Sequence, residues 1–395
     1  MTKTKKTRVS LVRIEDYSSE KIRKGLSESL ALHGGLKKLV PSKSSIFIKI
    51  NHLSPASPPE KAIITHPAFT KEVIKLLLEL NCHITVGDDI QSKEEDGFIA
   101  SGYRQMCEEQ GVRLINLKET GFQEVDCRGQ LLKKAYISSK ILEADVVINL
   151  PKLKTPSFTI YTGAVKNMYG IIPHGLRLHY HRLYQRNEIF SQMLVDIFSC
   201  VPPHITIMDA ITAMEGEGPS AGNPKPLGLV LASQDAVAVD AVAAELIGIP
   251  PEEIFSIQNA HERGLGIGRM EEIEVLGEMV QEVRKEDFKH SALAVGFLRR
   301  KIPAFLYAYF QDQLIFTPKV RENKCTGCME CVEVCPAHVV REQGNKVIIQ
   351  KNLCIHCMCC HEVCRFQAIK LKQRPIGKFI RKAASLYRRA KYLIS

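Results

Sequence analysis

The feature that most constrains this 395-residue chain is a duplicated run of cysteines near its C-terminal end. Each run has the spacing C-x2-C-x2-C-x3-C, and each cysteine of the second run lies 29 residues after its counterpart in the first. Three thiolates on one short loop can bind three irons of a cubane cluster, and the fourth thiolate must come from elsewhere. The pattern predicts iron–sulfur ligation by Cys325, Cys328, Cys331, Cys335, Cys354, Cys357, Cys360 and Cys364.

Residues 324–365 resemble the bacterial ferredoxin that carries two clusters. The resemblance implies two 4Fe–4S clusters with crossed ligands, in which Cys364 completes the first cluster and Cys335 completes the second. Zinc sites usually pair C-x2-4-C motifs across a longer spacer, and disulfide frameworks suit small secreted domains. The spacing therefore favours clusters over both alternatives. Cys359, next to Cys360, is interpreted as a bystander and not as a ligand.

The cysteines outside the two runs, Cys82, Cys107, Cys127, Cys200 and Cys359, show no pairing pattern. No apolar segment follows the basic N-terminus as it would in a signal peptide, and the apolar runs are too short and too charged for a transmembrane helix. Thiolate-bound clusters need a reducing compartment, so we expect a cytoplasmic protein.

The net charge of +11 belongs to the C-terminal region alone. Residues 318–395 contain 16 Lys and Arg against five Glu, and the other residues balance at 38 basic against 38 acidic. Two clusters would add a charge of about −2 each, which this surplus partly offsets. We therefore expect no specific nucleic-acid partner. The tail at 374–395 reads as a basic amphipathic helix, for which anionic lipid, an acidic redox partner and the chain's own surface are open alternatives.

The rest of the sequence alternates between strand and helix patterns, which predicts an α/β domain with a mainly parallel sheet flanked by helices. Strands are expected at 7–14, 45–51, 82–89, 112–117, 144–155, 204–211 and 226–233, and helices at 18–33, 67–80, 94–110, 187–201, 235–248 and 250–264. We expect four parts: an α/β substrate or ligand domain at 1–290, an apolar connector at 291–317, a small α+β two-cluster ferredoxin-like domain at 318–373, and the basic tail at 374–395.

The large domain also carries motifs of a known family. Residues 163–170 read G-x-x-K-N-x-Y-G, and other pieces are GDD at 87–89, IPHGLRLHYHR after the first motif, MEGEGP at 214–219 and DAVAVDAVA at 235–243. With these pieces, residues 7–265 resemble the family known as domain of unknown function 362, many members of which carry a C-terminal ferredoxin unit. One departure is His174, which stands where the family pattern has glycine. The resemblance implies no substrate.

Ligands of open α/β sheets bind beyond the carboxyl ends of the strands. Polar clusters at 49–52, 87–89, 152–155 and 209–219 fall at such ends, which motivates treating them as one site. The cofactor-binding or substrate-binding candidates are Lys152, Lys154, Thr155, Asp88, Glu215 and Glu217. Lysines and amides that converge there suit a carboxylate or phosphate, and the acidic residues could bind a divalent metal. Solvated loops and ordinary strand-end turns are the alternatives.

The catalytic candidates are Lys166, Asn167, Tyr169, Asp209 and His181. Lys166 lies among apolar residues, so we expect it to point into a cleft, to have a lowered pKa, and to donate or accept a proton with Tyr169 as its partner. His181 matches the family pattern. His179 and His181 could also ligate a metal, but we place them on a loop, where histidines more often make ordinary hydrogen bonds.

These features lead to an iron–sulfur oxidoreductase as the leading hypothesis. Single electrons would pass through two 4Fe–4S clusters to or from an anionic substrate or second cofactor in the α/β domain. The competing hypothesis is a non-catalytic electron carrier or docking protein that relays electrons to a partner protein. The expected partners are an electron donor or acceptor protein and an anionic small molecule, with peripheral membrane contact through the tail as a further alternative.

Overall fold

The computed structural model describes residues 6–53, 57–90, 97–127, 129–156, 158–290, 316–364 and 366–373, with Pro375 and Phe379. The expected connector therefore lies outside the described residues up to residue 315, and so does the expected tail apart from Pro375 and Phe379. No helix in the described part of the chain is both long enough and apolar enough to cross a bilayer.

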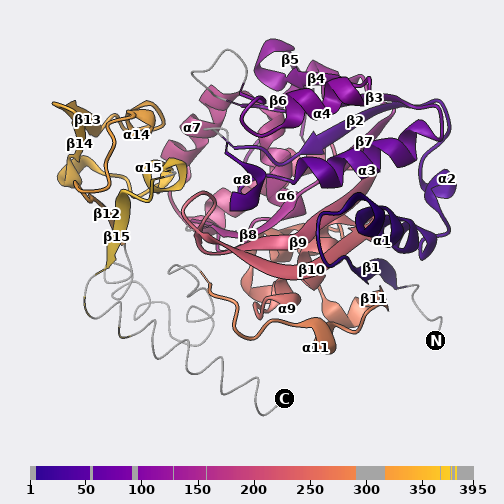
Figure 1. The fold of residues 1–395 in the computed structure, drawn as a ribbon. Helices are drawn as coiled ribbons and strands as arrows, with labels where there is room; N and C mark the ends of the chain where they lie inside the picture. The colour runs from indigo at the N-terminus through magenta and orange to yellow at the C-terminus, as the bar shows by residue number, and fades with distance from the viewer. Residues whose placement is uncertain are drawn as a thin grey trace.

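The larger part is an α/β domain around a nine-stranded sheet, as predicted (Figure 1). The strand order is β11-β1-β10-β9-β7-β2-β3-β4, and β8 pairs with β9. All neighbours in this sheet are parallel except β10, which is antiparallel to β1 and β9. The strands are β1 (Thr7–Arg13), β2 (Ser45–Ile50), β3 (His83–Asp88), β4 (Arg113–Asn116), β7 (Val146–Leu150), β8 (Lys152–Pro156), β9 (Ile205–Gly218), β10 (Asn223–Ser233) and β11 (Ile273–Gly277).

Helices cover both faces of this sheet, so its central strands are apolar on both sides. In β2, Phe47 faces one hydrophobic core while Ile46 and Ile48 face the other. This is the near-continuous apolar pattern expected of a buried parallel strand. The longer helices are α1 (Ser19–Ala31), α3 (Pro67–Leu78), α4 (Tyr103–Glu109), α7 (His174–Leu183), α8 (Asn187–Cys200), α9 (Ala236–Leu246) and α10 (Phe255–Glu262). The shorter ones are α2 (Leu36–Leu39), α5 (Ser139–Leu142), α6 (Ala164–Asn167) and α11 (Val280–Val283).

Several elements differ from the predictions. A hairpin of β5 (Phe122–Asp126) and β6 (Lys134–Ser138) was not predicted; both strands are only five residues long, and none of the β5 residues is fully buried. The expected helix over 94–110 is helical only from Tyr103 to Glu109 in the described residues. The strand expected at 204–211 continues to Gly218, because its second half pairs with β8 and β10.

The C-terminal unit, residues 316–373, is small and contains two antiparallel pairs. One pair is β12 (Phe316–Val320) with β15 (Ile369–Gln373), and the other is β13 (Val340–Gln343) with β14 (Lys346–Ile349). The short helices α14 (Glu330–Glu333) and α15 (Cys359–Val363) each follow a left-handed residue, Met329 or Met358. These two methionines are 29 residues apart, so the duplication is repeated in the backbone. In Figure 1 the unit lies beside the α/β domain, with α15 next to α7.

Candidate functional site

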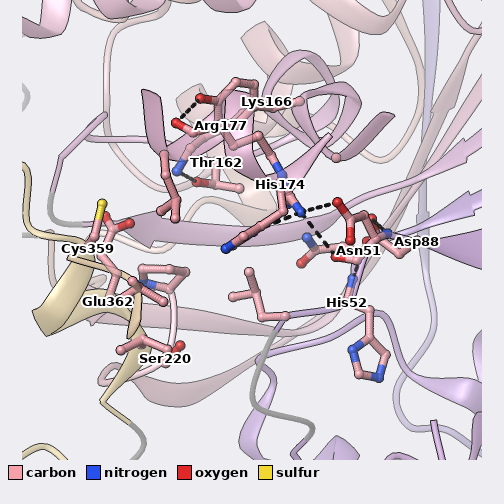
Figure 2. A pocket seen from close by; sticks show the side chains of 18 of the residues that line it. Asn51, His52, Asp88, Thr162, Lys166, His174, Arg177, Ser220, Cys359 and Glu362 are labelled. Atoms are coloured by element: carbon pink, nitrogen blue, oxygen red, sulfur yellow. Dashed lines mark hydrogen bonds and ion pairs between the residues drawn. The ribbon is translucent and has the colours of Figure 1, made fainter. Parts of the chain in front are cut away.

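A cavity of about 630 Å³ lies between the α/β domain and the C-terminal unit (Figure 2). This volume is typical of sites that bind small molecules. The α/β side contributes polar residues that include Asn51 and Asp88 after β2 and β3, while the C-terminal unit contributes Cys328, Cys359 and Glu362. Figure 2 shows Cys359 and Glu362 approaching from the side opposite Asn51 and Asp88. Residues more than 300 positions apart in the chain therefore share one cavity.

Helix α6 carries the G-x-x-K-N motif and is held in place by Asp240 from α9. The two carboxylate oxygens of Asp240 accept the backbone N–H groups of Ala164 and Val165 at 2.5 and 3.0 Å, and one also accepts the Tyr161 hydroxyl at 2.9 Å. A Cβ at Gly163 would lie only 2.1 Å from that carboxylate, so glycine is required there. Burial raises the pKa of Asp240 to about 7, although the hydrogen bonds oppose this shift. The motifs at 163–170 and 235–243 thus meet in one structural contact.

Asn167 is oriented by a chain of amide hydrogen bonds. Asn149 donates its amide N–H to the Ala164 carbonyl at 3.0 Å, so its Oδ1 is the atom that accepts from Nδ2 of Asn167 at 2.7 Å. Nδ2 of Asn167 also lies 3.4 Å from the carbonyls of Lys49 and Ile50. The network fixes which end of the Asn167 amide is the donor. Its Oδ1 is left buried and without a hydrogen-bond partner in the described structure.

Lys154 and Lys166 form a basic patch on the α/β wall of the cavity. The Nζ of Lys154 donates to the Ile63 carbonyl at 2.5 Å, and the Nζ of Lys166 donates to the Thr162 hydroxyl at 3.3 Å. Burial lowers the pKa of both amines; Lys166 lowers that of Lys154 further, whereas Glu362 opposes the shift at Lys166. Lys166 therefore borders the cavity, and burial lowers the pKa of its amine. Its catalytic role stays a prediction.

The inner end of the cavity is held by two ion pairs. Lys49 lies 2.7 Å from Asp88, and Arg177 lies 2.6 Å from Asp89. Burial pushes the first pair toward neutrality, lowering the pKa of Lys49 and raising that of Asp88, while their mutual attraction opposes both shifts. A Cβ at Gly170 would lie 2.6 Å from the Asp88 carboxylate, so the last glycine of the motif makes room for this pair.

His181 lines the cavity from α7, which corrects the expectation that His179 and His181 lie on a loop. Residues two apart on a helix point in different directions, so these histidines are not placed to share a metal. The His181 ring packs against Phe190 with 4.5 Å between ring centroids, and its buried Nδ1 has no hydrogen-bond partner in the described structure. Burial lowers the pKa of His181 to about 3, so the ring is neutral.

Tyr169 also lines the cavity, but it does not pair with Lys166. Its hydroxyl donates to the carbonyl of Arg177 at 2.8 Å, which fastens the motif to α7. Lys166 instead contacts Thr162. The expected pairing of Tyr169 with Lys166 is therefore not the one the structure forms.

Lys152 and Asp209 lie outside the cavity lining, in a separate buried network. Lys152 is 2.8 Å from Asp209 and 2.7 Å from the Tyr17 hydroxyl, which itself donates to Asp209 at 2.9 Å. The Asp209 carboxylate also accepts the N–H of His66 at 3.0 Å. Because Lys152 and Asp209 pair with each other, they stabilise the junction of β8 and β9. Neither residue lines the cavity.

The remaining candidates on β8 and β9 also point elsewhere. Thr155 donates to the Gly216 carbonyl at 3.1 Å, and Glu215 accepts the N–H of Lys289 at 3.0 Å. Neither these two nor Glu217 lines the cavity, whereas Pro219 and Ser220 just beyond them do. Among the described residues, no three His, Cys, Asp or Glu side chains converge closely enough to hold a single metal ion. The suggested divalent-metal site on Asp209, Glu215 and Glu217 therefore has no support in their geometry.

The eight motif cysteines all lie in the C-terminal unit, where thiols of the two runs are neighbours. Burial raises the pKa of the Cys331 thiol to about 12, and the thiols that add to this shift are Cys364, Cys328 and Cys325. Burial also raises the pKa of the Cys360 thiol, and the neighbouring thiols that add to the shift are Cys357, Cys354, Cys331 and Cys335. Thiols of both runs therefore lie near one another, and their division between clusters stays a prediction.

These thiols fit an iron–sulfur cofactor. Each thiolate of a cubane site binds its own iron, so the four sulfurs need not converge on one point. The fourth thiol of each run accepts a backbone N–H four residues later, Val339 to Cys335 at 3.3 Å and Ala368 to Cys364 at 3.2 Å. Such N–H groups stabilise thiolate charge on cluster ligands. Cys328 belongs to the first run and also lines the cavity.

One expectation about the other cysteines is wrong. Cys127, just after β5, and Cys200, at the end of α8, form a disulfide with 5.3 Å between their Cα atoms. The pairing was hidden from the sequence because 73 residues separate the two positions. Disulfides are typical of oxidising compartments, so this pair and the thiolate motifs point to different surroundings.

Some residues of the cavity were expected from the sequence and others were not. Asn51, Asp89, Arg177 and Glu362 all line it. Asn51 and Asp89 belong to the polar clusters at 49–52 and 87–89, which were expected to share one site because they fall at the carboxyl ends of strands. Arg177 and Glu362 depend on how α7 and the C-terminal unit are placed, for which the sequence carries no local signal.

Comparison with known proteins places these observations in context. A thylakoid-associated protein of Synechocystis sp. is 28% identical over 259 residues, which cover 65% of this chain and 79% of that protein. Among solved structures, the lactate racemase apoprotein from Thermoanaerobacterium thermosaccharolyticum has a TM-score of 0.41 at 15% identity over 58% of this chain. A Thermotoga maritima protein has a TM-score of 0.37 at 15% identity, also over 58% of this chain. The matches span only 54% and 58% of those two structures.

Two family models match the chain. The model of a 4Fe–4S binding domain matches residues 317–340, which include the first cysteine run. The model described as domain of unknown function 362 matches residues 46–245, just over half of the chain. That match contains the sheet edge, α6 and α7, which together form the α/β wall of the cavity. The chain therefore belongs to the family described as domain of unknown function 362.

Proposed function

We propose that this protein is an iron–sulfur oxidoreductase whose reaction takes place in the cavity between the two units. The observation that carries the proposal is the shared lining: Cys328, a thiol of the first run, and Lys166, an amine with a lowered pKa, border the same space. An electron-transfer ligand and a proton-transfer group at one small-molecule site are what a coupled reduction or oxidation requires. An anionic substrate or second cofactor would bind at Lys154 and Lys166.

The proposed cofactors are two 4Fe–4S clusters, one on each crossed group of four cysteines. When bound, such clusters supply single electrons at potentials tuned by their surroundings. The chain's own contribution is to bury Cys331, Cys335, Cys360 and Cys364 in one small core and to place Cys328 at the cavity. That arrangement gives electrons a short covalent route to the ligand site.

Lys166 is the proposed proton donor or base, because burial lowers the pKa of its amine and so eases proton release. Asn167 and the neutral His181 would orient the substrate, and Tyr169 holds α7 against the motif. Asp209 and Lys152 have a structural role in this proposal, since they neutralise each other away from the cavity. We place the protein in the cytoplasm, because eight thiolate ligands outweigh one disulfide; fractionation of the producing cells checks this location.

The test uses protein purified without oxygen. About eight irons per chain are expected for two clusters. The reduced protein is then mixed with fractions of a metabolite extract, and reoxidation is followed by visible absorbance. We expect one fraction to reoxidise the wild type and to act more than about tenfold more slowly on Lys166→Ala, the usual minimum loss for a proton-transfer group. Lys24→Ala, an exposed lysine on α1, is the matched control.

The competing function is a non-catalytic electron carrier. It is favoured if no metabolite fraction reoxidises the protein while a partner protein does, and the oxidoreductase proposal then fails. Equal rates for Lys166→Ala and the wild type would remove Lys166 from the site. Two or four irons per chain would rule out the two-cluster cofactor.

A further inference from the structure

The cavity has two walls of opposite charge that do not touch. Lys154 and Lys166 stand on the α/β wall, and neither makes an ion pair among the described residues. Glu362 of α15 stands on the other wall, close enough to influence both amines electrostatically. Figure 2 shows Glu362 and Lys166 on different sides of the open space. A buried charge normally has a partner, so this gap is unusual unless a ligand fills it.

Three residues that line the same space carry unpartnered oxygens. Oδ1 of Asn51, Oδ1 of Asn167 and Oε1 of Glu362 are buried and have no hydrogen-bond partner in the described structure. Asn51 and Asn167 are only 8% and 4% exposed, so bulk water is not at hand to satisfy them. The Asn149 network fixes the Asn167 oxygen as an acceptor. All three atoms need a hydrogen-bond donor, and an unsatisfied buried acceptor carries a real cost.

The lysine wall and the unpartnered oxygens call for different chemical groups on one ligand. The lysines attract an oxyanion, whereas the three oxygens repel one and attract N–H or ammonium groups. A plain anion satisfies only the lysine wall. A molecule with a carboxylate at one end and an ammonium at the other satisfies both walls at once.

We infer that the cavity binds an amino acid or an amino-acid-like zwitterion, with its carboxylate at Lys154 and Lys166 and its ammonium group at Glu362 and the Asn167 oxygen. This inference rests on the proposed function only in treating the cavity as a ligand site. It adds the substrate class and assigns Glu362 as a binding residue supplied by the C-terminal unit.

The test measures binding to the intact oxidised protein by calorimetry with matched pairs of probes. The pairs are glycine and acetate, β-alanine and propanoate, 4-aminobutanoate and butanoate, and 6-aminohexanoate and hexanoate. Within each pair only the ammonium group differs, and the series varies the charge separation. At the length that matches the gap, we expect the amino acid to bind about tenfold more tightly than its plain acid, the effect of one charge-assisted hydrogen bond.

Two variants locate the two ends of the bound probe. Glu362→Gln should remove the preference for the amino acid and leave the plain acid unchanged, whereas Lys166→Met should weaken both probes about tenfold. Glu342→Gln, an exposed glutamate on β13, should change neither. If Glu362→Gln instead tightens binding of the plain acids, Glu362 competes with the anion and the inference is overturned. Absence of any preference for the amino acids overturns it as well.

These outcomes are separate from those of the proposed function. Binding of an amino acid by a protein that no metabolite reoxidises would sink the oxidoreductase and keep the ligand class. Reoxidation by a metabolite without an amino group, with no binding preference within the pairs, would sink the ligand class alone.

Discussion

His66 shows how strongly single side chains are committed to one protonation state in this protein. It precedes α3, its Nδ1 accepts the N–H of Ala68 at 3.2 Å, and its ring stacks on Tyr17 with 3.8 Å between centroids. Only a neutral ring can accept at Nδ1. Burial lowers the pKa of His66 to about 4, and Lys152 adds to the shift while Asp209 opposes it. The helix start is thus tied to an uncharged histidine.

This state predicts acid sensitivity. Because the folded pKa lies below the unfolded value of 6.5, the unfolded chain binds more protons between pH 6.5 and 4, and stability falls as the pH drops through that window. Going from pH 7.5 to 5 should cost about 2 kcal/mol from His66 alone. His66→Asn keeps a capping acceptor. In urea unfolding, its free energy of unfolding should fall by about 2 kcal/mol less than that of the wild type between pH 7.5 and 5.

The control for this measurement is His83→Asn, at an exposed position on β3. It should change the free energy of unfolding equally at both pH values. If His66→Asn retains the full acid sensitivity of the wild type, the buried neutral state assigned to His66 is wrong.

At the residue scale, the sequence indicated which side chains could do chemistry but not which of them face the cavity. Lys166 was identified because its neighbours are apolar, and it does border a cavity. Lys152 and Asp209 carried an equally good signal but pair with each other, since β8 and β9 run side by side and bring them into register. No local pattern separates a lysine that faces a cavity from one that faces an aspartate on the next strand.

At the scale of elements, α6 depends on a residue outside itself. The helix has only four residues, too few to be stable alone, and its first N–H groups are accepted by Asp240. Asp240→Ala should leave both N–H groups and the Tyr161 hydroxyl without an acceptor, at about 3 kcal/mol in unfolding free energy. The rate of backbone amide hydrogen exchange at Ala164 and Val165 should rise in the same variant.

Asp240→Asn is the matched control, because its amide keeps one acceptor oxygen at the same place. Its loss should be smaller, and only part of the exchange protection should disappear. Unchanged protection at Ala164 and Val165 in Asp240→Ala would show that α6 is held by packing alone.

The strands and helices of the sheet were largely predictable, because buried strands and amphipathic helices have distinct periods. The failures occurred where tertiary context decides. His179 and His181 were expected on a loop, yet they lie on α7, where Arg177 pairs with Asp89 and the Tyr169 hydroxyl donates to the Arg177 carbonyl. The β5–β6 hairpin is likewise fastened from outside, by the disulfide to α8.

At the scale of the whole molecule, the two units differ in what stabilises them. The α/β domain has extensive apolar cores on both faces of its sheet. The core of the C-terminal unit contains ten buried residues, four of which are Cys331, Cys335, Cys360 and Cys364. A core this small, with its centre made of ligands, depends on the cofactor it binds. We therefore expect the wall that carries Glu362 to depend on the iron–sulfur cofactor too.

Removal of iron should accordingly unfold one unit and spare the other. Cys359→Ser and Cys360→Ser form a matched pair, because the two residues are adjacent and only Cys360 belongs to a C-x2-C-x2-C-x3-C run. In hydrogen exchange, Cys360→Ser should lose protection over β12 to β15, whereas Cys359→Ser should keep it, and β2 and β7 should stay protected in both. Protection of the C-terminal unit in iron-free protein would contradict this dependence. If the dependence holds, cluster loss also opens the cavity, because Glu362 leaves its place opposite Lys166.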